Sequence, residues 1–160
     1  MLAQVVPSPP QPAMARRAVP RLLVAFDGSP GAWRALDAAI RLAAGGEAEL
    51  TIAGVVGDPA PWFACAVPMA ASPLYRHDAL VAMQQTLAAA RDEIPPTVRA
   101  EVRVLHGGAA SALVALADSG RYDLVLAGPR PSGRFRRLFR RSVTHALLTR
   151  AHASVLAVKD

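Results

Sequence analysis

The sequence contains one cysteine, one lysine and few aromatic residues, which make up 5% of its 160 positions. A single thiol, Cys65, excludes an internal disulfide, and the four histidines have no spacing typical of a zinc site, so we expect no metal centre. No apolar run approaches the roughly 20 residues that span a bilayer, so we expect no membrane partner. Disulfide-rich, zinc-dependent and membrane-spanning classes are therefore excluded.

Acidic residues are missing from one segment that carries the whole charge imbalance. The chain has 18 Lys and Arg against 12 Asp and Glu, and residues 130–141 hold six arginines and no acid. The remainder has as many acidic as basic residues. The net charge of +6 thus reflects one local segment and not a uniformly basic surface, which argues against a general or sequence-specific nucleic-acid partner.

The first twenty residues contain five prolines and no apolar periodicity. We expect residues 1–19 to form a disordered tail, with translation starting at Met1 or Met14. The segment lacks the apolar centre of a secretory signal, and basic residues are almost all arginine, a bias typical of GC-rich genomes. The sequence therefore predicts one cytoplasmic domain over residues 20–160, with 52% of the whole chain hydrophobic.

The folded part opens with a unit of two strands and a helix. Residues 22–26 form a continuous apolar run typical of a strand buried on both faces. Ser29 and Pro30 are a typical helix start, and apolar residues then recur at helical spacing as far as Gly45. A second apolar strand is expected over residues 50–56. Such a unit favours parallel pairing with a right-handed crossover.

The rest of the chain continues the alternation of strands and helices. The third strand differs from the others, because apolar and charged residues alternate strictly from Val98 to Val104, which predicts an edge strand with one wet face. The other expected segments are a long loop over 57–73, helices near 80–90, 109–119 and 142–151, and strands over 123–127 and 155–158. Five strands and four helices predict an α/β doubly wound parallel sheet with helices on both faces.

In such sheets, ligands bind beyond the carboxyl ends of the strands. The residues to consider are therefore Asp27 after the first strand, Val55 at the end of the second, and the segment from Gly128 to Ser142 after the fourth. The chain has no Walker A motif, no Gly-x-Gly-x-x-Gly after the first strand and no nucleophile elbow. We see no catalytic constellation, and we expect a protein that acts by binding and not as an enzyme.

Three passages, in their order and spacing, resemble the universal stress protein family. They are the segment 23–29 with its strand, acidic residue and helix start, the segment from His106 to Gly128, and the segment from Ser142 to Val158. The resemblance covers almost everything from Arg21 onward. It implies the strand order 3-2-1-4-5, a role in a stress response, and a homodimer formed through the last strand, here Val155, Leu156, Ala157 and Val158.

Many members of that family bind ATP, with Mg²⁺, through a loop of the form Gly, two residues, Gly, nine residues, Gly, then Ser or Thr. Here the spacing is kept but the interior glycines are not, because Gly128 and Ser142 remain while Pro131 and Arg141 replace the second and third glycines. Proline removes a backbone donor, and a Cβ crowds the phosphate position. We therefore expect ATP to bind weakly or not at all.

The alternative is that arginine side chains, Arg141 foremost, hold the phosphates in place of backbone amides. If a nucleotide binds, the resemblance places Asp27 and Val55 at its adenosine end. Gly128, Arg141, Ser142 and Val143 are then expected at its phosphate end.

The arginine segment has two interpretations of its own. Phe135, Leu138 and Phe139 have the spacing of one helix face, so the segment can be an amphipathic connector whose arginines are solvated. It can also be a polyanion-binding module that docks on phosphates or an acidic protein. The residues of that module are Arg130, Arg134, Arg136, Arg137 and Arg140.

Overall fold

A computed structural model describes residues 19–45, 48–57, 73–128 and 143–159 of the chain. The elements in chain order are β1 (Arg21–Ala25), α1 (Pro30–Ala44), β2 (Glu49–Val56), α3 (Pro73–Asp92), β3 (Arg99–His106), α4 (Ala109–Ala117), β4 (Leu124–Ala127), α5 (Val143–Arg150) and β5 (Ser154–Ala157). The predicted tail, most of the predicted 57–73 loop and the arginine segment lie outside the described residues.

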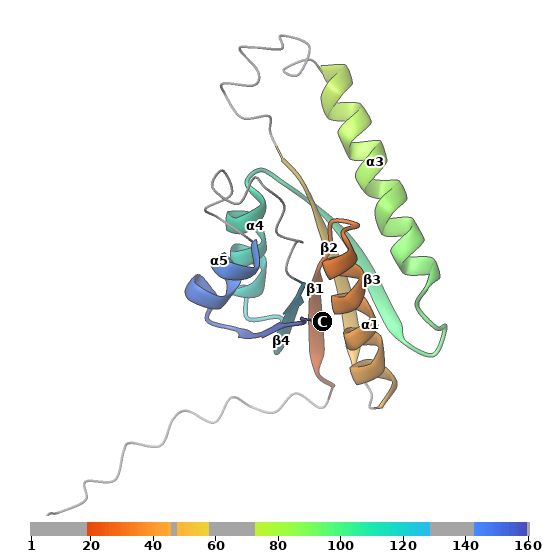
Figure 1. Ribbon diagram of the computed structural model, residues 1–160, viewed down its shortest axis with the longest axis vertical. Helices are drawn as coiled ribbons and strands as arrows, with labels where there is room; N and C mark the ends of the chain where they lie inside the picture. The colour runs from red at the N-terminus through yellow and green to blue at the C-terminus, as the bar shows by residue number, and fades with distance from the viewer. Residues whose placement is uncertain (1–18, 46–47, 58–72, 129–142, 160) are drawn as a thin grey trace, which may run out of the picture.

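The five strands form one sheet in the order β3-β2-β1-β4-β5, and all neighbouring strands are parallel. Helices α1 and α3 cover one face and α4 and α5 the other (Figure 1). The predicted doubly wound α/β fold, its strand order and the edge position of β3 are therefore confirmed. No helix in the described part of the chain is both long and apolar enough to cross a bilayer.

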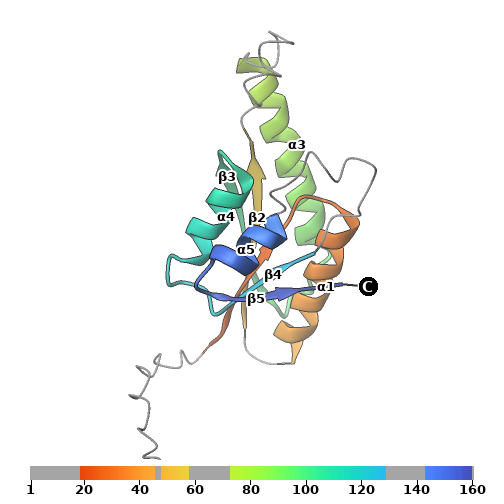
Figure 2. The same ribbon diagram turned by 60° about the vertical axis from the view of Figure 1, so that its left-hand side comes forward.

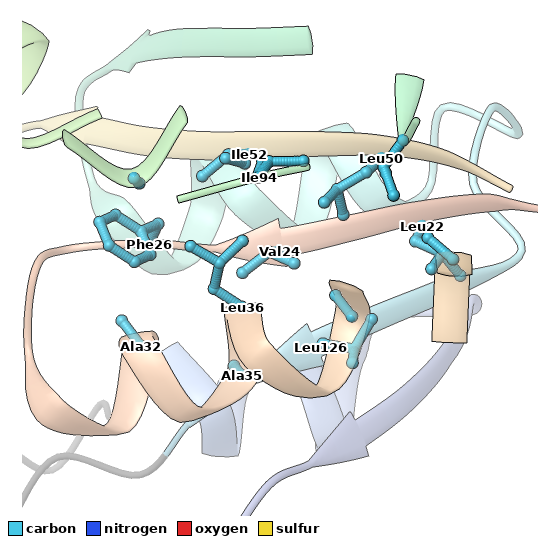
Figure 3. Close-up of a cluster of buried hydrophobic side chains, with 14 of the residues drawn as sticks. Leu22, Val24, Phe26, Ala32, Ala35, Leu36, Leu50, Ile52, Ile94 and Leu126 are labelled. Atoms are coloured by element: carbon cyan, nitrogen blue, oxygen red, sulfur yellow. The ribbon is translucent and has the colours of Figure 1, made fainter. Parts of the chain in front are cut away.

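Two hydrophobic clusters hold the layers together, one on each face of the sheet. Figure 3 shows the first, to which β1 contributes Val24, β2 contributes Ile52 and α1 contributes Leu36. The second cluster joins Leu23 and Val125 to the buried side of α4 and α5. Strands β1 and β4 contribute to both clusters, which explains why their sequences are apolar without alternation.

The predicted bounds are shifted by one or two residues at most strands. Strand β1 begins at Arg21 and ends before Phe26, and α4 ends at Ala117 with Asp118 as its C-cap, two residues earlier than predicted. The expected alternation of β3 is incomplete, because Val102 is 37% exposed. Helices α3 and α4 both contact β3, and the buried residues of α3 lie in its carboxyl-terminal half.

The end of α4 is tied to the start of β5 by one carboxylate. Oδ1 of Asp118 accepts the backbone N–H of His152 at 2.7 Å, and Oδ2 lies 3.2 Å from Nδ1 of the same residue. The backbone hydrogen bond first, and the side-chain contact second, hold the pKa of Asp118 below its ordinary value. The charged carboxylate is therefore the form that stabilises this link.

We expect the variant Asp118→Asn to be less stable than the parent only where Asp118 is ionised. A lowered folded-state pKa contributes stability that is present above the ordinary aspartate value, about 4, and is lost as pH falls through the folded value. Urea unfolding midpoints measured from about pH 2 to pH 6 should thus converge at the acid end. A gap between the two proteins that is constant over this range would contradict the assignment.

Candidate functional site

The register of the sheet brings the predicted site residues of three strands to one edge. Ala25 of β1 lies opposite Ala53 of β2 and Ala127 of β4. Asp27 and Val55 each follow their strand's aligned residue by two positions, and Gly128 follows by one. The carboxyl ends of β1, β2 and β4 thus place these residues together, as the sequence predicted.

Asp27 is exposed and organises the turn from β1 into α1. Its Oδ1 accepts the backbone N–H of Ser29 at 3.0 Å, and Oγ of Ser29 in turn accepts the N–H of Ala32 at 3.2 Å as the helix N-cap. Gly28 between them has a φ of +77°, which favours glycine. The positive end of α1 is therefore directed at the same edge of the sheet as the Asp27 carboxylate.

Packing against α1 requires glycine at position 128, independently of ligand binding. A Cβ at this position would lie 1.8 Å from the carbonyl oxygen of Gly31 and 2.1 Å from its carbonyl carbon. The carbonyl of Gly128 also accepts a hydrogen bond from Oγ1 of Thr144 at 3.1 Å. Sequence reasoning missed Gly31 and Thr144, and it assigned Gly128 to phosphate approach alone.

The remaining predicted residues divide into two groups. Val55 and Val143 are half-buried, and both pack against the hydrophobic cluster shared by α4 and α5, so their side chains form apolar support for this edge. Arg141 and Ser142 lie outside the described residues, together with the five arginines of the predicted polyanion module. The geometry of the phosphate end therefore stays a prediction.

The described part of this edge offers a carboxylate, a helix N-terminus and half-buried valines. Within the ranges that the structure describes, no three His, Cys, Asp or Glu side chains are close enough to hold a metal ion. An exposed acidic side chain next to half-buried valines can accept a hydroxyl or amino hydrogen while apolar surface contacts a ring. This arrangement suits binding of a small polar ring compound.

Comparison with known proteins agrees with this fold. A model of the Universal stress protein family matches residues 19–159. A universal stress protein solved in complex with cAMP is 28% identical, with a TM-score of 0.63 over 89% of this chain and 98% of that one. A protein of the same family from Burkholderia pseudomallei is 26% identical, with a TM-score of 0.63 over 88% and 96%.

A more distant structure shares the fold only. The universal stress protein from Archaeoglobus fulgidus in complex with dAMP is 16% identical, with a TM-score of 0.59 over 88% of this chain and 98% of that one. None of the curated protein sequences matches the chain.

Proposed function

Since the chain belongs to the universal stress protein family, we propose that it is a regulatory protein that binds an adenine nucleotide at the carboxyl ends of β1, β2 and β4. The observation that carries the proposal is the 28% identical structure in complex with cAMP, which aligns with 89% of this chain. The dAMP complex of the Archaeoglobus fulgidus protein is consistent with the same ligand class on this fold. We propose cytoplasmic action in a stress response, through binding and without turnover.

We propose further that a nucleotide with one phosphate binds more tightly than ATP. Pro131 and Arg141 stand where the family's ATP loop has glycines, so the backbone donors that hold a triphosphate are reduced in number and access. The adenosine end depends on other residues, Asp27 and Val55. A ligand with a single phosphate, such as AMP or cAMP, needs less of the altered loop.

Isothermal titration calorimetry with AMP, cAMP and ATP, the last with and without Mg²⁺, tests this order of affinity. We expect AMP or cAMP to bind at least tenfold more tightly than ATP. Tighter binding of ATP, lost in Arg141→Glu, would establish the alternative in which arginines hold the triphosphate. Absence of binding by all three nucleotides at millimolar concentration would overturn the proposed function.

Two substitutions of Asp27 separate its hydrogen bond in the turn before α1 from its proposed contact with the nucleotide. Asp27→Ala removes both the acceptor for Ser29 and the charge, whereas Asp27→Asn keeps an acceptor oxygen for the turn. We expect Asp27→Ala to weaken AMP binding at least tenfold. If Asp27→Asn weakens it equally while the unfolding midpoint stays unchanged, the carboxylate itself contacts the nucleotide. Unchanged affinity in both variants would exclude Asp27 from the site.

We also propose a homodimer through β5, which is the edge strand at the other end of the sheet from β3. Strand β5 pairs with β4 on one side, and among the described residues no strand pairs with its other side. Leu156 is 41% exposed on this strand and Leu148 of α5 is 53% exposed. An apolar strand edge of this kind is a ready surface for a second copy.

Substitution of Leu156 tests the dimer. We expect Leu156→Arg to place two charges in the symmetric interface and to convert the dimer to a monomer in sedimentation equilibrium. Leu42→Arg on α1 is the matched control, since Leu42 is 49% exposed and lies on another element. A parent protein that is monomeric at high micromolar concentration would contradict the proposal.

A further inference from the structure

A hollow lies at the amino ends of β1, β2 and β3, at the opposite edge of the sheet from the proposed nucleotide site. Its volume is about 420 Å³, within the range of small-molecule sites. It is lined by Arg21, Glu49, Leu50, Thr51, Arg99, Ala100, Glu101, Arg103, Arg121 and Tyr122. Neither the family resemblance nor the proposed function assigns a role to this amino-edge pocket.

The charged side chains of the pocket come from rows that cross three strands. Arg21 of β1 lies opposite Glu49 of β2, which lies opposite Arg99 of β3. Nε of Arg21 donates to Oε2 of Glu49 at 2.9 Å. Arg99 is exposed and makes no ion pair within the described part of the chain. The single carboxylate of this row therefore serves the first arginine, and Arg99 keeps its charge available.

Farther along the same face, Thr51 lies opposite Glu101, and Ala53 lies opposite Arg103. Nε of Arg103 donates to Oε1 of Glu101 at 2.8 Å. This hydrogen bond, followed by the proximity of Tyr122, raises the pKa of the Arg103 guanidinium, so its charge is permanent. The contact uses Nε, as does that of Arg21, and the Nη atoms that form a guanidinium fork take no part in either contact.

The electrostatic balance of the pocket favours an anion. Four guanidinium groups face two carboxylates in a concave site, and guanidinium forks bind phosphate and carboxylate groups in a bidentate manner. Asp123 accepts the backbone N–H of Arg21 at 2.8 Å beside the pocket, where its charge offsets part of this excess, and Asp118 bonds to His152. Thr51 and Tyr122 add hydroxyl groups to the lining.

We propose that the amino-edge pocket binds a small organic or inorganic anion that carries at least two phosphate or carboxylate groups. Such a ligand matches the excess of guanidinium groups over carboxylates in the lining and the volume of the pocket. A polymeric anion is a worse match, since the concave lining is confined to the ends of three strands and to the residues after α4. The pocket does not depend on the nucleotide site, which lies at the other end of the same strands.

Nuclear magnetic resonance titration of the full ¹⁵N-labelled chain tests the proposal, with pyrophosphate and citrate as the two probes. We expect saturable shifts of the amides of residues 99–103 and of Tyr122, with a submillimolar dissociation constant for at least one probe. The double variant Arg99→Gln/Arg121→Gln should weaken that binding at least tenfold. The stronger probe then identifies phosphate or carboxylate as the preferred group.

The control variant is Arg76→Gln on α3. It removes one positive charge from an exposed position near the amino-terminal end of α3, a part of the helix that extends away from the sheet (Figure 2), and it should leave the titration unchanged. Shifts confined to residues outside the pocket, or equal weakening by Arg76→Gln, would overturn the proposal. Adenine nucleotides report separately through the amides of Asp27 and Val55, so failure of one site is distinguishable from failure of the other.

Discussion

Gly128→Ala should destabilise the fold by about 3 kcal/mol, although it adds only a methyl group. The added Cβ would lie 1.8 Å from the backbone carbonyl oxygen of Gly31, at the start of α1. Relief requires movement of the whole helix against the end of β4, because no side chain is present that could rotate away. Loss of chain entropy in the unfolded state favours alanine by less than about 1 kcal/mol, too little to offset the overlap.

Urea unfolding of Gly128→Ala measures the effect, and Gly45→Ala is its control. Gly45 caps α1 with a φ of −82°, and the atoms nearest to its added Cβ would be at 3.7 Å, an ordinary contact distance. The control should therefore be neutral or slightly stabilising. Equal midpoints for the parent and Gly128→Ala would show that α1 and the end of β4 do not meet so closely.

The expected destabilisation affects how nucleotide binding by Gly128→Ala is interpreted, since Gly128 occupies the first glycine position of the family's loop. A loss of nucleotide binding in Gly128→Ala would report a shifted α1 as much as a lost phosphate contact. Ser29 and Asp27, which begin α1, would move with the helix. Substitutions of Asp27 and Arg141 are therefore the better probes of binding, since neither adds atoms between two backbones.

Local pattern was sufficient for most of the fold. The continuous apolar runs of β1 and β4 and the Ser29–Pro30 helix start depend on neighbouring residues, and each element is present with bounds shifted by no more than a few residues. The alternation in β3 correctly predicted an edge. The strand order, by contrast, came from family resemblance, because local pattern does not say which parallel strands are neighbours.

Features that depend on contacts between distant segments were missed. The amino-edge pocket needs Arg21, Glu49 and Arg99 in one row, and only the register of three strands makes them neighbours. The need for glycine at position 128 arises from Gly31 in the same way. At the proposed nucleotide site, the strand register brings Asp27, Val55 and Gly128 to one edge, while their role and the arginine-rich half of the site stay predictions.

Helix α3 shows that periodicity can predict a helix without predicting which of its residues pack against the sheet. Leu80, Met83, Leu87 and Ala90 have helical spacing, yet only Leu87 and Ala90 are fully buried in a helix of 20 residues. The amino-terminal part of α3 extends past the sheet (Figure 1), and Leu74 there is 63% exposed. The attachment of α3 thus depends on a few contacts near its carboxyl-terminal end.

Leu87→Ala should accordingly cost about 3 kcal/mol, because it removes a fully buried side chain from the cluster of β1, β2 and α1. Leu74→Ala makes the same chemical change on the same helix at an exposed position and should alter stability by less than about 0.5 kcal/mol. Urea unfolding gives both values. Amide hydrogen exchange adds a second readout, since α3 should lose protection in Leu87→Ala before β1 does.

Comparable losses in the two variants would mean that the exposed end of α3 is covered in solution. Loss of α3 protection would also open the wall beside Gly54, where Met83 lies so close that an added Cβ would be 2.4 Å from its Sδ. Gly54 belongs to β2, one residue before Val55. An effect of Leu87→Ala on AMP affinity that exceeds its effect in Leu74→Ala would therefore connect the attachment of α3 to the adenosine end of the proposed site.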